Sequence, residues 1–466
     1  MAMNLWQGEN AFTERPNKII TIDGAAQRKV VGRRSLGEWR PEARGHDALA
    51  TILGQNSIRD QRLLPLRHGR MAASPWTYYR GAAAVMAADL ASAPNTGITV
   101  QLCGDAHVLN FGLWNTPERN LAFDLRDFDE TLPGPFEWDV KRFLASLVIL
   151  ARANGVEAHA KDAVAAGYAG YRDWIATYST WPEIDIWYDS VSTEQLLDYA
   201  TSDDDHKLDK LIEKRAEKRS SRGAFKKLTS VVDGAQRITE DPPYRTHALN
   251  DHLAELETIV AQYQASVPDH ISSLWSRFDL VDAVQQVVGV GSVGMRVFLT
   301  LSEERRTSDP IFLQVKQAGP SVYEQFLSPS VYDNHGSRVI HGQRMIQSAT
   351  DMFVGWTSIS SDGDTGAPMD FYVRQFRDGK VIPKGEMIAP RLSQFATACG
   401  HVLARAHARS GDVQAIHDYL GSSSKAGDAF AEFAFAYADQ NDRDHAQLAK
   451  AIEDGEVDAV EGWPGR

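Results

Sequence analysis

The chain has 466 residues, of which 43% are hydrophobic and 24% charged, and its formal net charge at neutral pH is −13. This length allows a large core and a two-lobed enzyme, and the negative charge argues against nonspecific binding to nucleic acid. Two cysteines exclude a disulfide framework, and no apolar run approaches the roughly 18 residues of a membrane span. We therefore expect a cytoplasmic protein whose partners include neither nucleic acid nor membrane.

The first third of the chain divides into two segments. Residues 1–60 are polar and are expected to form a loosely structured N-terminal arm. Residues 61–155 begin with a helix predicted at 74–91, for which Ser74 is the N-cap and Pro75 the first helical residue. A strand at 97–104 and a helix at 134–155, with apolar residues at helical spacing, complete this segment.

Three further segments follow in the remainder of the chain. Residues 156–280 are mainly helical in pattern, residues 281–384 have strand character, and residues 385–466 return to helix. The highly charged stretch at 203–229 is interpreted as a solvated helix, or as a basic surface for an acidic ligand. Together the segments predict an α+β protein with a mainly helical large lobe and a β-rich small lobe.

The richest chemistry lies in the segment QLCGDAHVLNFGLW, residues 101–114. Asp105 precedes Asn110 by five residues, and the cluster FDLRDFDET then supplies Asp127 and Asp129. This is the spacing of the kinase catalytic loop, in which the Asp accepts a proton from the acceptor hydroxyl and the Asn holds a metal ion. Magnesium prefers oxygen ligands and keeps several waters. We therefore expect Asn110, Asp127 and Asp129 to hold Mg²⁺ together with the phosphates of ATP.

A second motif lies in the β-rich segment. Gly289, Gly291 and Gly294 have the spacing G-x-G-x-x-G, which occurs both in dinucleotide folds and in kinase loops that cover phosphates. Strand-like residues follow the last glycine, and the next predicted strand carries Lys316, as in a kinase small lobe. A β-hairpin with a surface lysine is the alternative. Glu324 is either the ion-pair partner that a kinase lysine requires or a solvated glutamate.

The series CGDAHVLN…RDFDE…GPFEWDVKR resembles the H-G-D-x-H-x-x-N…D-F-D…D-L-A series of aminoglycoside and choline phosphotransferases, which are protein kinase-like enzymes. The resemblance implies that Asp105 is the catalytic base and that Asn110 and Asp127 hold the metal ion. It also implies that Asp139, on a helix, braces the catalytic loop. Cys103 replaces the first histidine of the series.

The wider pattern RHGRM…SP…YYRG…GDAHVLNFG…DFDE, with YADQ near the end, is similar to a bacterial family catalogued as domain-of-unknown-function family 2252. That likeness covers most of the chain and implies no substrate.

The order of the motifs differs from that of a kinase. Asp105 lies 184 residues before Gly289, whereas in kinases the glycine loop and the lysine come first. Both assignments together require a circularly permuted chain, which folds tolerate at exposed loops. The segment 400–411 resembles the helix that leads into a kinase catalytic loop, and the helix at 74–91 is the alternative.

Several side chains near these motifs have two interpretations each. His107 is either a residue that braces its loop or a ligand. Arg67, Arg70 and Arg80 form salt bridges, or they bind the anionic group of a phosphorylated substrate.

Three functions fit these motifs. The favoured one is an ATP- and magnesium-dependent phosphotransferase that acts on a hydroxyl of a small molecule, because no A-P-E segment of a protein kinase follows Asp127. One alternative is a kinase-fold nucleotide-binding protein with lost or altered transfer activity, such as adenylyl transfer. The other is a metal-dependent phosphohydrolase that uses Asp105, His107, Asp127 and Asp129, which leaves Lys316 unexplained.

Overall fold

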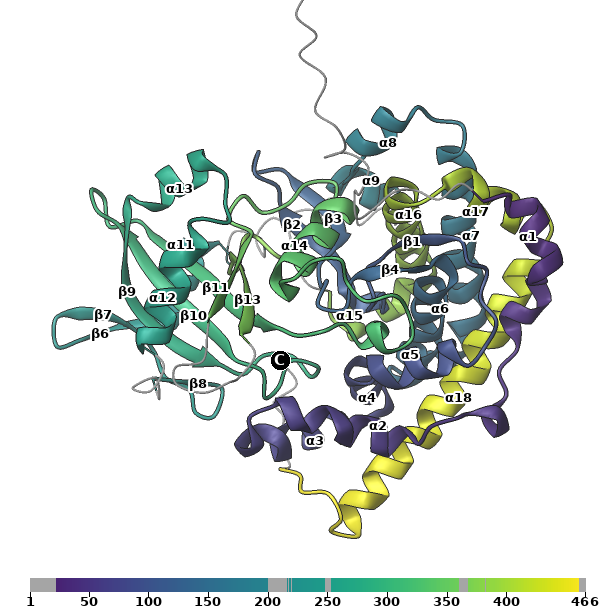
Figure 1. Cartoon of the computed structure of the whole chain (residues 1–466), viewed down its shortest axis with the longest axis horizontal. Helices are drawn as coiled ribbons and strands as arrows, with labels where there is room; N and C mark the ends of the chain where they lie inside the picture. The colour runs from purple at the N-terminus through teal and green to yellow at the C-terminus, as the bar shows by residue number, and fades with distance from the viewer. Residues whose placement is uncertain are drawn as a thin grey trace, which may run out of the picture.

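The protein contains both helices and strands, arranged in two parts. The computed structural model describes residues 22–199, 216, 218, 220–247, 253–359, 368–381 and 383–460. Within these ranges a mainly helical part lies beside a part built on a six-stranded antiparallel sheet (Figure 1). The predicted α+β class is confirmed. Across the ranges described, no helix combines the length and the apolar character needed to span a bilayer.

The helical part draws its helices from both ends of the chain. They are α1 (Gly24–Val30), α2 (Ala48–Gly54), α3 (Leu64–Ala72), α4 (Pro75–Gly81), α5 (Ala83–Ala91), α6 (Phe136–Ala153), α7 (Ala160–Tyr178), α8 (Glu183–Tyr188), α9 (Thr193–Asp198), α16 (Leu392–Ser410), α17 (Val413–Leu420) and α18 (Lys425–Glu453). Helix α6 is at the centre. The apolar residues whose helical spacing predicts it are all fully buried: Phe136, Val140, Phe143, Leu144, Leu147 and Ala151. Because α6 is apolar on most of its surface, other helices must cover it. Helix α18 runs along one edge of this group (Figure 1).

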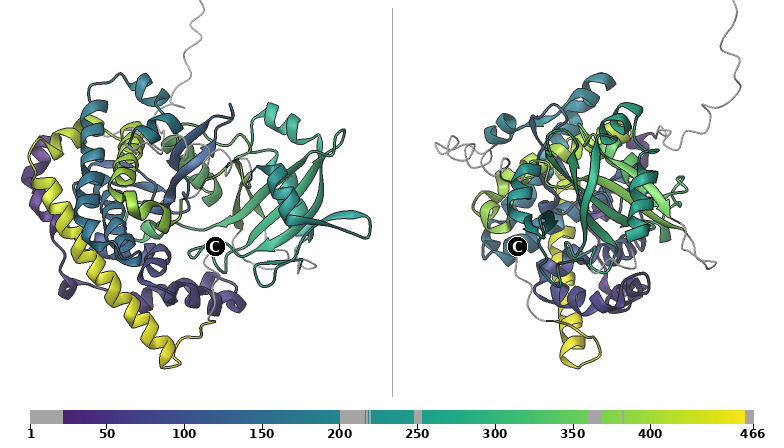
Figure 2. Two further views of the ribbon diagram at one scale, coloured as in Figure 1. Left: turned by 180° about the vertical axis from the view of Figure 1, so that it is seen from behind. Right: turned by 90° about the vertical axis from the view of Figure 1, so that its left-hand side faces the viewer.

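The sheet part has the strand order β12-β13-β11-β10-β9-β8. These strands are β8 (Arg245–Thr246), β9 (Phe278–Gln286), β10 (Val297–Glu304), β11 (Pro310–Ala318), β12 (Gly355–Ile359) and β13 (Met369–Gln375). A hairpin of β6 (Thr229–Val232) and β7 (Ala235–Ile238) extends from it, as Figure 1 and the left view of Figure 2 show. The predicted strands at 281–318 and near 370 are therefore present.

Helices cover both faces of this sheet. They are α11 (Ser221–Leu228), α12 (Leu253–Tyr263), α13 (Asp269–Trp275) and α14 (His335–Ile346), and the short α15 (Gly385–Ile388) follows the last strand. Leu256 and Ile259 of α12 share an apolar cluster with Leu313 of β11, and Leu228 of α11 packs with Phe312 on the other face. Residues 220–247 and 253–275 thus belong to the sheet part, although the sequence pattern assigned them to the helical lobe. The predicted helix at 203–229 lies largely outside the described residues.

Two small sheets connect the helices to the site. Strand β1 (Thr99–Leu102) pairs with β4 (Leu132–Pro135), and β2 (Phe111–Asn115) pairs with β3 (Leu121–Leu125). Strand β3 also pairs with β5 (Val191–Ser192). The loops that carry Asp105 and Asp127 lie between these strands, so the small sheets fix where both loops begin and end.

The helix predicted at 74–91 begins as expected but is divided in two. Ser74 and Thr77 form a reciprocal capping box, and Pro75 occupies the first turn. The backbone leaves the helical conformation at Ala82, between α4 and α5. Gly81 stands at this break, where a Cβ atom would meet side-chain atoms of Met71 and Val290 at 3.0 Å. The local alanine-rich sequence favours an unbroken helix, but the helix breaks beside Gly81, where the packing against Met71 and Val290 is close.

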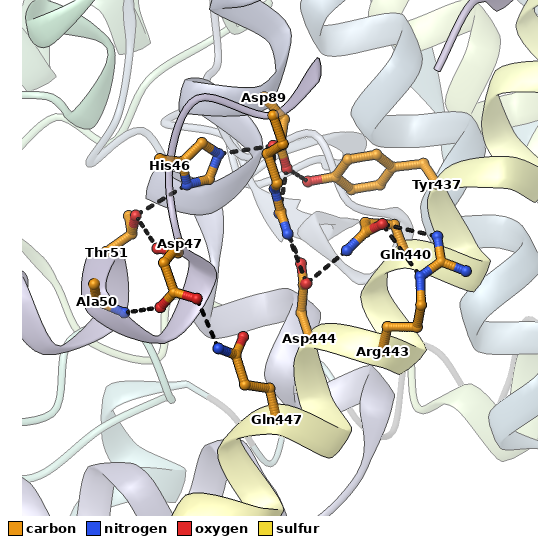
Figure 3. A network of polar contacts seen from close by, with 11 residues as sticks. His46, Asp47, Ala50, Thr51, Asp89, Tyr437, Gln440, Arg443, Asp444 and Gln447 are labelled. Carbon is orange, nitrogen blue, oxygen red and sulfur yellow. Dashed lines mark hydrogen bonds and ion pairs between the residues drawn. The ribbon is translucent and has the colours of Figure 1, made fainter. Parts of the chain in front are cut away.

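Residues 22–60 form an arm that packs on the helical part. Arg44 forms ion pairs at 2.7 Å with Asp89 of α5 and with Asp444 of α18. The same Asp89 carboxylate accepts a hydrogen bond from Tyr437 at 2.8 Å and contacts His46 at 2.7 Å (Figure 3). Buried charges are tolerated only when they are paired. This network therefore holds the arm against α5 and α18.

Replacing Arg44 should test this attachment. Arg44→Met removes the cation between two buried carboxylates, and we expect the free energy of unfolding to fall by about 3–5 kcal/mol. Arg40→Met is the control, because Arg40 is exposed and pairs with an exposed glutamate, so its loss should change stability by less than about 1 kcal/mol. Denaturant titration measures both values. Similar values for the two variants would show that the network does not hold the arm.

Candidate active site

The loop that carries Asp105 is fixed by a buried carboxylate beneath it. Asp139, in the first turn of α6, accepts hydrogen bonds from the backbone N–H groups of Cys103 at 2.8 Å and Gly104 at 3.1 Å. His407 of α16 approaches the same carboxylate at 3.4 Å. The brace expected of Asp139 is therefore present. Gly104 is required here, because its φ is +83° and a Cβ atom would lie 2.4 Å from the carbonyl oxygen of Glu130.

Asp105 is held by an arginine that sequence motifs did not identify. One carboxylate oxygen accepts a hydrogen bond from Arg142 Nε at 2.7 Å and forms an ion pair with Arg142 Nη2 at 2.6 Å. The other oxygen lies 3.7 Å from His107 Nε2. Burial raises the pKa of Asp105, and the Arg142 charge opposes that rise. Arg142 therefore orients Asp105 and leaves one oxygen available to a ligand. The only signal in the sequence was the position of Arg142, one turn beyond Asp139 on the same helix.

Asn110 and Asp127 provide the oxygen atoms that best fit a metal ion. The Asn110 side-chain amide donates to the carbonyl oxygens of Asp105 at 2.8 Å and Asp127 at 3.1 Å, so its own oxygen faces away from these bonds. Asp127 Oδ1 is buried without a hydrogen-bond partner. Burial, followed by the charge of Asp129, raises the pKa of Asp127, which a cation at this position would reverse.

Protein side chains alone do not complete a metal site here. Nowhere in the described part of the chain do three His, Cys, Asp or Glu side chains gather as they would around a metal ion. A magnesium ion would therefore rely on Asn110, Asp127, waters and ligand oxygens, which is how Mg²⁺ is commonly bound.

Asp129, which was expected to contact the metal ion, is bonded to two side chains of the sheet. Its carboxylate forms an ion pair with Lys316 of β11 and accepts a hydrogen bond from Tyr372 of β13 at 2.6 Å. Although burial raises the pKa of Asp129, Lys316 and the hydrogen bonds lower it overall. Both oxygens have donors, so Asp129 is the partner of Lys316 in this structure.

The ion pair predicted between Lys316 and Glu324 is not formed. Glu324 accepts a hydrogen bond from the Ser321 N–H at 2.9 Å as part of a capping box. It also lies 3.7 Å from Arg338 of α14 and 3.8 Å from His335. Because Glu324 is needed to cap this short helix and faces α14, it points away from Lys316.

The glycine turn between β9 and β10 is attached to the helical part. Arg70 donates to the carbonyl oxygen of Gly289 at 2.6 Å, and Arg59 donates to those of Gly291 at 2.7 Å and Val293 at 2.6 Å. Val290 is 2% exposed and packs in a cluster with residues of α3, α4 and α5. We call this set of contacts from Arg59, Arg70 and the Val290 cluster the clasp. No motif in the sequence predicted it.

A single cavity of about 160 Å³ joins most of the predicted residues. Those that line it are Asp105, Asp127, Asp129, Gly289, Gly291 and Lys316, together with His107, Arg59 and Arg80. Three predicted residues are not among those that line the cavity: Asn110, Gly294 and Glu324. The cavity therefore collects residues from both parts of the chain, although Asp105 and Lys316 are far apart in sequence.

Of the three arginines singled out near α4, only Arg80 reaches this cavity. Arg67 is fully buried and donates to Gln55 at 2.8 Å and to Asn56 at 3.2 Å. Arg70 belongs to the clasp. Arg67 and Arg70 therefore hold backbone and side-chain oxygens in place, whereas Arg80 faces the cavity.

Comparison with known proteins places the chain in a family. No match was found among curated proteins or among solved structures. Residues 59–451, which include Asp105, Asp127, Lys316 and the glycine turn, match a family of bacterial proteins. The chain therefore belongs to the DUF2252 family, described as uncharacterized protein conserved in bacteria.

Proposed function

We propose that the protein is an ATP- and magnesium-dependent phosphotransferase that acts on a hydroxyl of a small molecule. The observation that carries this proposal is the meeting of Asp105, Asp127 and Lys316 at one cavity. These are the residue types that position an acceptor hydroxyl, a metal ion and a phosphate in phosphoryl transfer.

The arrangement of the sheet supports a protein kinase-like fold. The glycine turn joins β9 to β10, and Lys316 lies on β11, the third strand of the meander. Helix α14 follows β11 and lies between the sheet and the helical part (Figure 1). A glycine loop between two strands, a lysine on the third strand and a helix after it are the elements of a kinase small lobe.

The position of α16 supports a circular permutation. Ser410, its last residue, accepts a hydrogen bond from the Gln101 N–H of β1 at 3.1 Å. The following Gly411 packs against Thr99 and Val100. Helix α16 thus ends where the strand before the catalytic loop begins, although it comes much later in sequence. The alternative helix at 74–91 instead packs on the glycine turn, so α16 is the better candidate for that place.

The proposed chemistry gives each group one task. Lys316 and the backbone of the glycine turn hold the phosphates of ATP. Asn110 and Asp127 hold magnesium, which supplies charge neutralisation on the phosphates when it is bound. Asp105 orients the acceptor hydroxyl and receives its proton through the oxygen that Arg142 leaves available. Alignment of the two substrates then accounts for most of the rate, without a covalent enzyme intermediate.

Two ion pairs favour a second candidate. Asp105 is paired with Arg142, and Lys316 is paired with Asp129. If these pairs persist when nucleotide is bound, the protein binds nucleotide but transfers another group, such as an adenylyl group, or none.

Asp127→Asn should weaken magnesium-dependent binding of ATP. The substitution removes one negative charge at a position where Oδ1 has no partner, and we expect the affinity for ATP with magnesium to fall at least about 10-fold. Isothermal titration with and without magnesium measures the effect. Asp309→Asn, at an exposed ion pair, is the matched control and should bind normally. Unchanged binding by Asp127→Asn would contradict the metal assignment, and a zinc-dependent phosphatase activity of the wild type would favour the phosphohydrolase interpretation.

Asp105→Asn should separate transfer from binding. We expect nucleotide affinity to change little and the rate to fall by roughly 100- to 10,000-fold, the range for loss of general base catalysis. The asparagine oxygen can still accept from Arg142, and the melting temperature checks that the fold is kept. Magnesium-dependent hydrolysis of ATP by water provides the assay, and Lys316→Ala should lower nucleotide affinity as well.

The wild type determines how that result is interpreted. Equal turnover by wild type and Asp105→Asn would show that Asp105 is not the base. A wild type that binds ATP without turnover would place the nucleotide-binding candidate first.

A further inference from the structure

Arg80, near the end of α4, is the charged side chain of the cavity that no ion pair explains. It lines the cavity together with Asp105, His107 and Asp127. Its Nε atom is buried without a hydrogen-bond partner, and within the described residues its guanidinium forms no ion pair or hydrogen bond. Burial lowers the pKa of Arg80, and Asp105 and Asp127 oppose that shift from nearby. Arg80 as a whole is half-buried, and a guanidinium at the wall of a cavity, with a buried Nε–H and no acceptor, has donors free for a ligand.

A purely structural role for Arg80 does not account for these observations. A cation at a helix C-terminus can stabilise the helix dipole and bond the last carbonyl groups. The Ala82 N–H closes the end of α4 on the Tyr79 carbonyl instead, and Arg80 donates to no carbonyl within the described residues. Its side chain is therefore directed at the cavity rather than at its own helix.

The other charged side chains that line the cavity have contacts that do not involve Arg80. Asp105 pairs with Arg142 and Asp129 with Lys316. Glu130 accepts a hydrogen bond from the Val322 N–H at 2.8 Å, and Asp127 carries the unpartnered oxygen assigned to magnesium. With Asp127 on a metal ion, Arg80 has no direct counter-ion among the described residues, and an anionic group on a ligand would supply one.

The position of Arg80 places that anion on the acceptor side. Phosphates of the nucleotide already have Lys316 and the glycine turn on the sheet. Arg80 comes from the helical part, on the same side as Asp105 and His107. Arg59 lines the same cavity, and its Nη1 is held by the glycine turn. The clasp thus holds a second guanidinium at the wall of the same cavity.

We propose that Arg80, with Arg59 beside it, forms a subsite for an oxyanion carried by the acceptor. The acceptor is then a small hydroxylated molecule that bears a phosphate or carboxylate group, which a guanidinium binds through two parallel hydrogen bonds. The assignment to the acceptor rests on the phosphotransferase function proposed above, whereas the oxyanion subsite itself does not.

Inorganic phosphate serves as the probe in a titration of the full chain. The protein is first saturated with magnesium and a non-hydrolysable ATP analogue, so that the nucleotide phosphate site is filled. We expect phosphate to bind to this complex and Arg80→Gln to lower its affinity at least about 10-fold. Arg80→Lys, which keeps the charge but not the paired donors, should retain part of the affinity. Arg305→Gln makes the same charge change at an exposed ion pair and should bind phosphate as the wild type does.

The outcomes distinguish the two proposals. Equal phosphate affinity of wild type and Arg80→Gln would overturn the subsite. So would a loss of analogue binding in Arg80→Gln with phosphate binding unchanged, because Arg80 would then serve the nucleotide. If the analogue does not bind to the wild type, the phosphotransferase proposal fails. The phosphate titration is then made on the free protein, where a loss confined to Arg80→Gln still supports the oxyanion subsite.

Discussion

The ion pair between Lys316 and Asp129 joins the two parts of the molecule, and the cavity depends on it. Around it, Arg338 of α14 donates to the carbonyl oxygens of Asp129 and Thr131 at 2.7 Å. Ser321 Oγ donates to the Glu130 carbonyl oxygen at 2.9 Å. The segment after β3 is thereby fixed against the sheet by both backbone and side chains. A buried ion pair with these added hydrogen bonds retains its geometry, because losing either partner would leave an uncompensated charge.

This pairing has a consequence for the whole cavity. Asp105 and Asp129 each have a cation, so two side chains of opposite charge remain without a fixed partner: Asp127 and Arg80. Proteins do not keep unpaired charges in buried positions for stability alone, and such groups gather at functional sites. Both proposals use this imbalance, one by assigning a cation to Asp127 and the other by assigning an oxyanion to Arg80. A ligand that brings both charges would give Asp127 and Arg80 a partner each.

Local patterns predicted what depends on neighbours in the sequence. The capping box at Ser74, the buried helix α6 and the strand that carries Lys316 follow from spacing and turn chemistry. The bracing role of Asp139 came from a motif. The ion-pair partner of Lys316 could not be predicted in this way. Glu324 lies close to Lys316 in the sequence, but the carboxylate that pairs with Lys316 is that of Asp129, almost 190 residues earlier. Contacts between distant segments likewise decide three other features. These are the role of Arg142, the position of residues 220–247 and 253–275 in the sheet part, and the packing of the arm.

The clasp restricts the movement of the glycine turn through contacts from a segment that lies far from the turn in the sequence. The glycine turn is held by arginine bonds to three of its carbonyl oxygens and by the burial of Val290. Full burial of a valine side chain is worth roughly 1.5–3 kcal/mol, and each charge-assisted hydrogen bond adds to that. A glycine turn on a free hairpin moves easily, because few contacts oppose local opening. Here the helices that precede β1 in the sequence also cover the turn, so opening the cavity requires these contacts to break together. The segment that precedes the Asp105 loop in the sequence therefore also covers the glycine turn, and the turn cannot open unless the contacts that Arg70 of α3 and the Val290 cluster make with it are lost.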